Sequence, residues 1–402
     1  MSGLSSQFFV DAANQFGTPL YCYNASQISE QYQKLQSAFA SCDVRFFYAA
    51  KALTNQSVLK HIRSVGCSVD CSSINEVKLA QLAGFQAGEI LYTSNSVNFS
   101  EIEEAVSLGA YVNVDSLSAL EKFGKKFGNS YPVGLRLRPN IMAGGNLKIS
   151  TGHADSKFGI PAEKLPEVGR LVEQYAIQVH TLHIHTGSEI KEAAVFIQGV
   201  QFLLSVAPAF PQLKVIDLGG GFKVPYRPTE KETDLIQISQ SLSELVEAHY
   251  KKTGQQLQAW FEPGKFLVCE AGYLLTKVNV VKDNGDYAFA GVDTGLNHLI
   301  RPMLYDAYHE IENCSNPQGE VKKYQVVGNI CETDTLGANR DLPLIREGDI
   351  LVIKNAGAYG FEMSSQYNAR YRPAEVLVEN GKLRLIRRRE TLEDLLRTQE
   401  NY

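Results

Sequence analysis

Short runs of β-branched and aromatic residues alternate with amphipathic stretches over the first two-thirds of the chain. Such short apolar runs are typical of buried strands, whereas apolar residues at helical spacing indicate helices. Residues 56–65, for example, place Val58, Leu59 and Ile62 on one helical face. The apolar runs end near eight positions: Ala50, Asp70, Thr93, Asp115, Arg138, His185, Leu218 and Glu262. Eight strand–helix units predict an α/β fold built on a (β/α)8 barrel.

An open, doubly wound sheet is the alternative architecture for alternating strands and helices. Such sheets usually have fewer strands and begin with a GxGxxG turn, which this sequence lacks. We therefore predict the barrel. A serine followed three residues later by a glutamate is a helix-capping signal, and it predicts the starts of the second, third and fourth barrel helices. These pairs are Ser73/Glu76, Ser100/Glu103 and Ser118/Glu121.

The sequence pattern changes after about residue 270. Asn284-Gly285 and Asn380-Gly381 each lie between alternating apolar and polar runs, which is a strong hairpin signal. The segment 16–24, FGTPLYCYN, also has the pattern of a strand. We therefore predict a barrel over residues 27–268 and a β-rich barrel or sandwich domain over residues 1–26 and 269–402, with an N-terminal strand completing the second domain.

Composition and charge narrow the class of protein. The 402 residues carry a net charge of -5 with no basic block, which argues against binding to nucleic acid or an anionic membrane. The apolar stretches are shorter than the roughly 20 residues of a membrane span, and the N-terminus lacks a secretory pattern. Seven cysteines without regular spacing suggest a reducing compartment. We expect a cytoplasmic protein.

Polar residues follow the predicted strands, and barrel enzymes carry their chemistry at these carboxyl ends. Lys51 follows the run FFYAA, where burying an isolated ammonium group would be costly. It therefore either reaches solvent or has lost its charge in a covalent bond. The other polar or glycine residues at strand ends are Asp70, Arg138, His183, His185, Gly219, Gly220, Gly221 and Glu262.

Three consecutive glycines, Gly219 to Gly221, follow the seventh strand. Glycines let backbone N–H groups converge on an anion, and the loop after strand seven is a usual phosphate site in barrels. A tight turn without a ligand explains the triple glycine equally well. The preceding turn, HTGSE, supplies the hydroxyl group of Ser188, which could bind the same phosphate.

His183 and His185 lie on one face of their strand, because side chains alternate along a strand. An HxH pair of this kind occurs in metal hydrolase barrels, so a metal site is a competing hypothesis. It would need further ligands, yet the first strand has no HxH pair, and the nearest other histidine, His153, lies in a predicted loop. We expect no metal, His185 stacking on a flat ligand, and His183 as a core residue.

Glu262 ends the eighth strand after an aromatic run, where a carboxylate needs a cation or a donor. A protonated pyridine nitrogen would satisfy it. Lys51, Glu262 and a phosphate-binding turn together match the aldehyde, the ring nitrogen and the phosphate of pyridoxal 5'-phosphate. We therefore predict this cofactor, bound covalently to Lys51.

The motifs in this order resemble those of the barrel-type, alanine-racemase-like pyridoxal-phosphate decarboxylases, and the resemblance runs nearly end to end. They are YAAKA, STGHADSKFGI, HIHTGSE, DLGGGF, FEPGK, RPMLYDAYHEI, NICETDTLG and NAGAYGFEMSSQYNARYRPAEV. The resemblance implies that Lys51 binds the cofactor aldehyde, His185 stacks on the ring and Glu262 holds the ring nitrogen. The phosphate contacts that it implies are Ser188, Gly220, Gly221, Gly264 and Tyr359.

The resemblance also implies roles around the substrate. Cys331 matches the proton donor of the family, and the expected substrate contacts are Lys265, Arg301, Tyr305, Glu332 and Tyr359. In such enzymes the residues matching Cys331 and Glu332 reach the cofactor of the other subunit, so a head-to-tail homodimer with shared sites is expected, and the β-rich domain would contribute substrate and dimer contacts.

The sequence departs from the family pattern at two places. Lysine stands at position 265 where arginine is usual, which keeps the charge but not the bidentate guanidinium. The run CETDTLG replaces the commoner Cys-Glu-Ser-Gly-Asp, so that only Cys331 and Glu332 carry over from it.

The substrate is expected to have an amino-acid head at each end. Arg301 would bind a distal carboxylate and Glu332 a distal amine, which predicts the decarboxylation of meso-2,6-diaminopimelate to L-lysine and CO2, the last step of lysine biosynthesis. The alternative is another barrel-type decarboxylase of basic amino acids, of the ornithine/arginine or carboxynorspermidine type. A non-catalytic regulator on this fold would have lost Lys51 or Cys331, and both are present.

Overall fold

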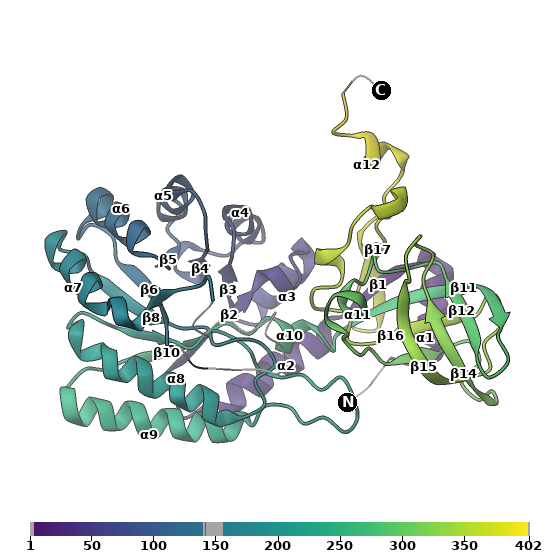
Figure 1. Ribbon diagram of the computed structural model, residues 1–402, viewed down its shortest axis with the longest axis horizontal. Coiled ribbons are helices and arrows are strands. Elements are labelled where there is room, and N and C mark those ends of the chain that lie inside the picture. The colour runs from purple at the N-terminus through teal and green to yellow at the C-terminus, as the bar shows by residue number, and fades with distance from the viewer. Residues whose placement is uncertain (1–3, 140, 142–155, 401–402) are drawn as a thin grey trace. The chain divides into compact units, whose positions relative to one another are not determined.

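The computed structural model describes residues 4–139, 141 and 156–400, so His153 lies outside the described residues. The chain divides into two compact units, whose ribbons are traced in Figure 1. The barrel unit comprises Ser29–Val224 and Lys231–Leu267, and the β-unit comprises Met1–Ile28, Pro225–Glu230 and Val268–Tyr402. No helix in the part of the chain that the structure describes is long and apolar enough to span a membrane.

Eight parallel strands close the barrel, as the sequence predicts. Around the ring they follow the order β2-β3-β4-β5-β6-β8-β9-β10, and β10 pairs with β2. Their bounds are β2 (Val44–Ala49), β3 (Ser68–Cys71), β4 (Ile90–Thr93), β5 (Tyr111–Val114), β6 (Val133–Arg138), β8 (Val179–His183), β9 (Val215–Asp217) and β10 (Gln258–Phe261). The two-residue β7 (Ile160–Pro161) pairs with β6 outside this ring.

Helices alternate with the barrel strands (Figure 1). They are α2 (Ala25–Ala38), which begins in the β-unit, α3 (Gln56–Ser64), α4 (Ile74–Leu82), α5 (Phe99–Ser107), α6 (Leu117–Phe127), α7 (Leu165–Gln174), α8 (Ala193–Val206), α9 (Leu235–Thr253) and α10 (Lys265–Val268). In α9 the side chains of Leu235, Ile238 and Leu242 are buried on one face. Asp234 caps the first turn, and Gly254 ends the helix in the left-handed conformation.

Only one of the three predicted capping serines caps its helix. The side chain of Ser73 accepts a hydrogen bond from the Glu76 N–H group and begins α4 as expected. The predictions for Ser100 and Ser118 are wrong by two residues, because Asn98 caps α5 and Ser116 caps α6. Asparagine and serine are both good N-caps, and in each helix the observed cap lies two residues before the predicted serine.

The β-unit contains a mixed sheet in the order β15-β14-β12-β11-β1-β17-β18, to which β16 and β13 are added through β11. Its strands are β1 (Leu20–Asn24), β11 (Gly272–Asp283), β12 (Ala288–Val292), β13 (Ile311–Asn313), β14 (Val321–Val327), β15 (Thr335–Pro343), β16 (Ile350–Ile353), β17 (Ala374–Glu379) and β18 (Lys382–Arg387). Its helices are α1 (Ser6–Phe16), α11 (Arg301–Tyr305) and α12 (Leu392–Leu396).

The two predicted hairpins and the N-terminal strand are present in this sheet. Asn284-Gly285 lies in the turn between β11 and β12, and Asn380-Gly381 joins β17 to β18 with positive φ at both residues. β1 pairs antiparallel with β11 and parallel with β17, so the N-terminal segment completes the sheet of the C-terminal region.

The interior of the barrel changes from apolar to polar along the strands. Phe47, Leu91, Val215 and Trp260 come from β2, β4, β9 and β10 and pack in one buried cluster. Since residues two apart share a face of a strand, Asp217 and Glu262 point to the same side as Val215 and Trp260. The apolar cluster therefore fills the barrel below a layer of polar side chains.

Candidate active site

The three turns that follow β8, β9 and β10 touch one another. A Cβ atom on Gly220 would lie 2.3 Å from the Glu262 carbonyl oxygen, and one on Gly221 would lie 2.5 Å from the Gly187 carbonyl oxygen. Gly219 and Gly221 also have positive φ, of 65° and 104°. Only glycine fits these positions, and the turn lies after the seventh barrel strand, where barrels commonly bind phosphate.

The imidazole ring of His185 packs on this glycine turn. The Gly220 N–H group donates a hydrogen bond to Nδ1 at 3.2 Å. Burial lowers the pKa of His185 to about 3, with a further contribution from the charge of Lys51. The ring is therefore neutral with its proton on Nε2, and a neutral, flat ring is suited to stacking on an aromatic ligand.

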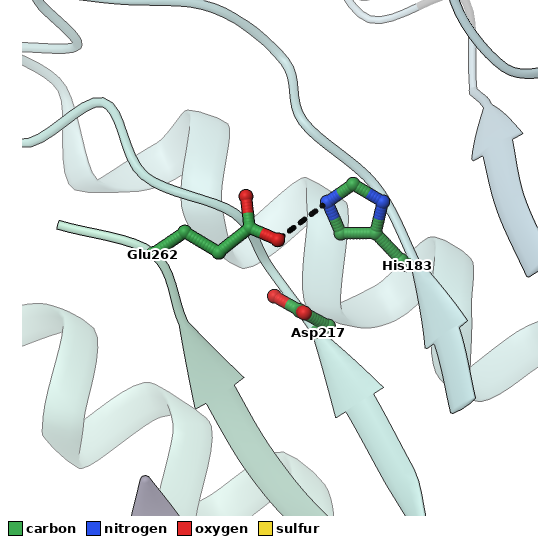
Figure 2. A group of neighbouring side chains, drawn as sticks. All are labelled: His183, Asp217 and Glu262. Carbon is green, nitrogen blue, oxygen red and sulfur yellow. Dashed lines mark ion pairs between the residues drawn. The ribbon is translucent and has the colours of Figure 1, made fainter. Parts of the chain in front are cut away.

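His183, Asp217 and Glu262 converge in the polar layer, as Figure 2 shows. His183 and Asp217 are register partners on β8 and β9, and His183 Nε2 lies 3.3 Å from Glu262 Oε1. His183 and Asp217 have no exposed surface, and Glu262 is 5% exposed. His183 is thus as buried as the sequence predicts, and it also faces the carboxylate of Glu262.

The carboxyl groups in this layer differ in charge. Burial alone would raise the pKa of Glu262, but His183 and Lys51 outweigh it and lower that pKa to about 2. Burial and the charge of Glu262 raise the pKa of both Asp70 and Asp217 well above the ordinary range. Glu262 therefore keeps its charge more readily than the two aspartates beside it.

Lys51 lies in a short 3-10 turn, Ala50–Ala52, directly after β2. Its side chain is 41% exposed, and Nζ lies 3.7 Å from Asp70 Oδ2. The lysine is therefore accessible to a ligand from solvent, and its ammonium group faces an acid that can exchange a proton with it.

Lys265 follows the Glu262-Pro263-Gly264 turn and is buried. Its ammonium group donates a hydrogen bond to Glu189 Oε1 at 2.7 Å, and Lys223 lies 3.7 Å from the other oxygen of that carboxylate. Glu189 follows Ser188 in the HTGSE turn and has a φ of 61°. A carboxylate of this chain thus contacts the lysine that the family resemblance assigns to the substrate.

Arg301 and Tyr305 lie at the two ends of α11 in the β-unit. The guanidinium group of Arg301 is 5.9 Å from the ring of Tyr305 and 5.5 Å from the ring of Tyr226. Arg301 is only 5% exposed, so it does not belong to a surface ion pair. A buried arginine between two aromatic rings is held in a fixed position.

Cys331 and Glu332 lie in the exposed turn between β14 and β15. Asn368 contacts Cys331 twice: its Nδ2–H donates to Sγ at 3.1 Å, and its Oδ1 accepts from the Cys331 N–H group at 3.0 Å. The Tyr367 hydroxyl donates to Glu332 Oε1 at 2.8 Å and lies 3.7 Å from Sγ. Asn368, and then Tyr367, lower the pKa of the thiol.

Asn368→Asp is expected to raise the pKa of the Cys331 thiol, because a carboxylate would replace the N–H donor that faces Sγ. The thiolate is the form that reacts with iodoacetamide, so alkylation at pH 7 should slow about tenfold for each unit by which the pKa rises. The rate of Cys331 alkylation, followed by peptide mass spectrometry across pH, measures this. Asn339→Asp adds the same charge at an exposed site of the β-unit and is the control. An unchanged pH profile in Asn368→Asp would contradict the assignment.

Tyr359 follows β16 and is half-buried, with a φ of 56° between the close-packed Gly357 and Gly360. It belongs to the β-unit, as do Arg301, Cys331 and Glu332, whereas the cofactor residues expected from the strand ends belong to the barrel unit. Sequence reasoning missed Asp217, Tyr367 and Asn368. Because side chains alternate along a strand, the position of Asp217 two residues before Gly219 could have indicated that Asp217 faces the site.

The barrel residues fit pyridoxal phosphate. The closely packed glycine turn lies at the strand ends where barrels commonly bind phosphate, Glu262 is an ionised carboxylate for a protonated ring nitrogen, and Lys51 is an accessible amine. The donor atoms of His183, Asp217 and Glu262 also lie within 4.8 Å of one another, a spacing that a metal ion could use. A catalytic zinc site keeps one position open to water, however, and these three side chains are buried.

Comparisons with known proteins agree with this fit. Residues 25–269 match the family described as "Pyridoxal-dependent decarboxylase, pyridoxal binding domain". The chain is 39% identical to the diaminopimelate decarboxylase of Methanothermobacter thermautotrophicus over 400 residues, covering 97% of this chain and 93% of the relative. It is 37% identical to that of Neisseria meningitidis serogroup B over 391 residues, covering 95% and 92%. Its fold matches the crystal structure of the Helicobacter pylori diaminopimelate decarboxylase complexed with L-lysine, with a TM-score of 0.90, 32% identity and coverage of 97% and 98%.

Proposed function

The chain belongs to the diaminopimelate decarboxylase family of pyridoxal-dependent decarboxylases, and from this membership we propose that it converts meso-2,6-diaminopimelate to L-lysine and CO2. The observation that carries the proposal is similarity over nearly the whole length of several enzymes of that name. The glycine turn, the ionised Glu262 and the accessible Lys51 at the barrel strand ends also support it, because together they would bind the cofactor.

When bound, pyridoxal phosphate withdraws the electron pair that departing CO2 leaves on the substrate carbon. The residues of this chain would hold the group for that task. The ionised Glu262 would pair with the protonated ring nitrogen, the neutral ring of His185 would stack on the pyridine, and the glycine turn with Ser188 would bind the phosphate. Lys51 would hold the aldehyde carbon, with Asp70 beside it to take or return a proton.

Cys331 would donate a proton to the carbon that has lost CO2. The thiol gives up its hydrogen, and the sulfur is left as a thiolate that accepts the Asn368 N–H hydrogen bond. In the proposed head-to-tail homodimer, Cys331 and Glu332 would act at the cofactor of the other subunit. Tyr359 would add its hydroxyl group to the phosphate contacts.

The far end of the substrate would decide specificity. A distal carboxylate needs a fixed cation, and the buried Arg301 supplies one, with Tyr305 at the other end of the same helix. A distal amine needs an acid, and Glu332 would supply it. Lys265 would contact a substrate carboxylate only by sharing its ammonium group with Glu189.

Product analysis tests this function directly. The purified protein would be incubated in parallel with meso-diaminopimelate, L-ornithine and L-arginine, each with added pyridoxal phosphate. Lysine is expected from the first, with little diamine from the other two. Faster formation of putrescine or agmatine would reject the proposed substrate and favour a decarboxylase of basic amino acids.

Arg301→Ala is expected to raise KM for meso-diaminopimelate about 10- to 100-fold, because a charged hydrogen bond to the distal carboxylate is lost. Cofactor absorbance should be unchanged, since Arg301 is assigned to the substrate alone. Arg384→Ala removes one positive charge from an exposed ion pair of the same unit and is the control. Steady-state kinetics and thermal unfolding of both variants measure the effect. An unchanged KM in a folded Arg301→Ala protein would reject this role.

A further inference from the structure

Asp217 is a fully buried carboxyl group in the polar layer of the barrel, and neither the family resemblance nor the proposed mechanism uses it. Its Oδ1 accepts a hydrogen bond from the Gly219 N–H group at 3.0 Å. Its Oδ2 is buried and has no hydrogen-bond partner among the described residues. An ionised carboxylate has about four acceptor sites, and a single donor leaves most of them unmatched in this fully buried position.

The neighbours of Asp217 explain what its second oxygen can do. One oxygen of Asp217, one of Glu262 and a nitrogen of His183 all lie within 4.8 Å of one another. In Figure 2 the carboxyl group of Asp217 lies beside the His183–Glu262 pair, on the strand between theirs. His183 already faces Glu262 at 3.3 Å. Two ionised carboxylates this close together would repel each other, so a proton on Asp217 Oδ2 removes the repulsion and supplies a donor toward Glu262.

The other charged groups of this layer are consistent with that arrangement. Arg136 on β6 is the register partner of His183. Its positive charge interacts more strongly with Glu262 than with Asp217. Asp70 on β3 is itself a buried acid whose pKa is raised, and its charge is a further cause of the raised pKa of Asp217. Burial and the charge of Glu262 both raise the pKa of Asp217.

The backbone ties Asp217 to the glycine turn as well. Gly219 donates its N–H to Asp217, and its carbonyl oxygen accepts the Glu262 N–H at 2.7 Å. Gly220 donates to His185. One side chain therefore contacts the proposed phosphate turn on one side and the proposed partner of the ring nitrogen on the other.

We infer that Asp217 is a positioning residue that stays protonated, orients the carboxylate of Glu262 through its Oδ2–H group, and fixes the start of the glycine turn through Oδ1. The inference rests on the proposed function for the meaning of Glu262. It predicts that a neutral amide of the same shape can replace Asp217, because an asparagine offers the same donor and the same acceptor, whereas a methyl group offers neither.

Infrared spectroscopy of the purified protein with its cofactor tests the charge of Asp217. The difference spectrum between wild type and Asp217→Asn should contain the C=O stretching band of a protonated carboxyl group at neutral pH. Asp283→Asn, at an exposed turn of the β-unit, should instead remove an ionised carboxylate band and is the control. An ionised carboxylate band in the Asp217→Asn difference spectrum would overturn the inference.

Cofactor titration tests the positioning. Asp217→Ala is expected to weaken pyridoxal phosphate binding about tenfold, because it removes the acceptor of the Gly219 N–H group and the proposed donor toward Glu262. Asp217→Asn should restore affinity to within a few-fold of wild type. Equal affinity in wild type and Asp217→Ala would refute the role, as would failure of Asp217→Asn to rescue binding. If Asp217→Ala does not fold, the infrared spectrum and the affinity of Asp217→Asn decide. Neither measurement needs an amino-acid substrate, so failure of the product assay would reject the proposed function separately.

Discussion

Lys51→Ala is expected to lose decarboxylase activity by about a thousandfold or more, the largest effect of any single substitution in this chain. The substitution removes the amine that would bind the cofactor aldehyde, together with the ammonium group that lies 3.7 Å from Asp70. Purified Lys51→Ala should also lack the visible absorbance of covalently bound cofactor. Steady-state assays and an absorbance spectrum of the same sample measure the two effects.

Borohydride reduction followed by peptide mapping identifies the lysine independently of activity. Wild type should carry a pyridoxyl label on residue 51, and Lys51→Ala should carry none. Lys60→Ala, an exposed lysine on the neighbouring α3, is the matched control and should keep both label and activity. A label on another lysine in wild type would remove the basis of the cofactor assignment.

The barrel could be predicted from the sequence because its strands are short, apolar and regularly spaced. Strands β3, β4, β6 and β10 end at or within one residue of the expected positions Asp70, Thr93, Arg138 and Glu262. The hairpin at Asn380-Gly381 was equally predictable, because both residues must adopt positive φ in a two-residue turn and these two do so at low cost. Local chemistry decides such features, so a local pattern is sufficient.

The arrangement within the polar layer was not predictable in the same way. His183, Asp217 and Glu262 meet because β8, β9 and β10 are adjacent in a particular register, and a single sequence does not show register. His183 was expected to be an ordinary core residue for this reason. The contacts of Cys331 with Tyr367 and Asn368 bridge 36 and 37 positions of chain, so they too depend on tertiary structure.

The ion pair of Lys265 with Glu189 could not be anticipated either. The sequence shows that lysine replaces the usual arginine, and the structure adds that a carboxylate from the HTGSE turn takes up its charge. A side-chain ion pair therefore joins the two turns in this chain.

Glu262→Gln is expected to lower kcat by about 10²- to 10³-fold while the cofactor remains bound. Glutamine keeps the shape and one hydrogen bond, but it has no negative charge to keep the ring nitrogen protonated, so the electron pair left by CO2 is stabilised less well. Because the pKa of Glu262 is about 2, this carboxylate stays ionised in any neutral assay, and the loss should persist from pH 6 to pH 8. Glu244→Gln, on the exposed face of α9, is the matched control. If Glu262→Gln retained wild-type kcat with bound cofactor, Glu262 would not be the partner of the ring nitrogen, and the buried His183–Glu262 pair would have only a structural role.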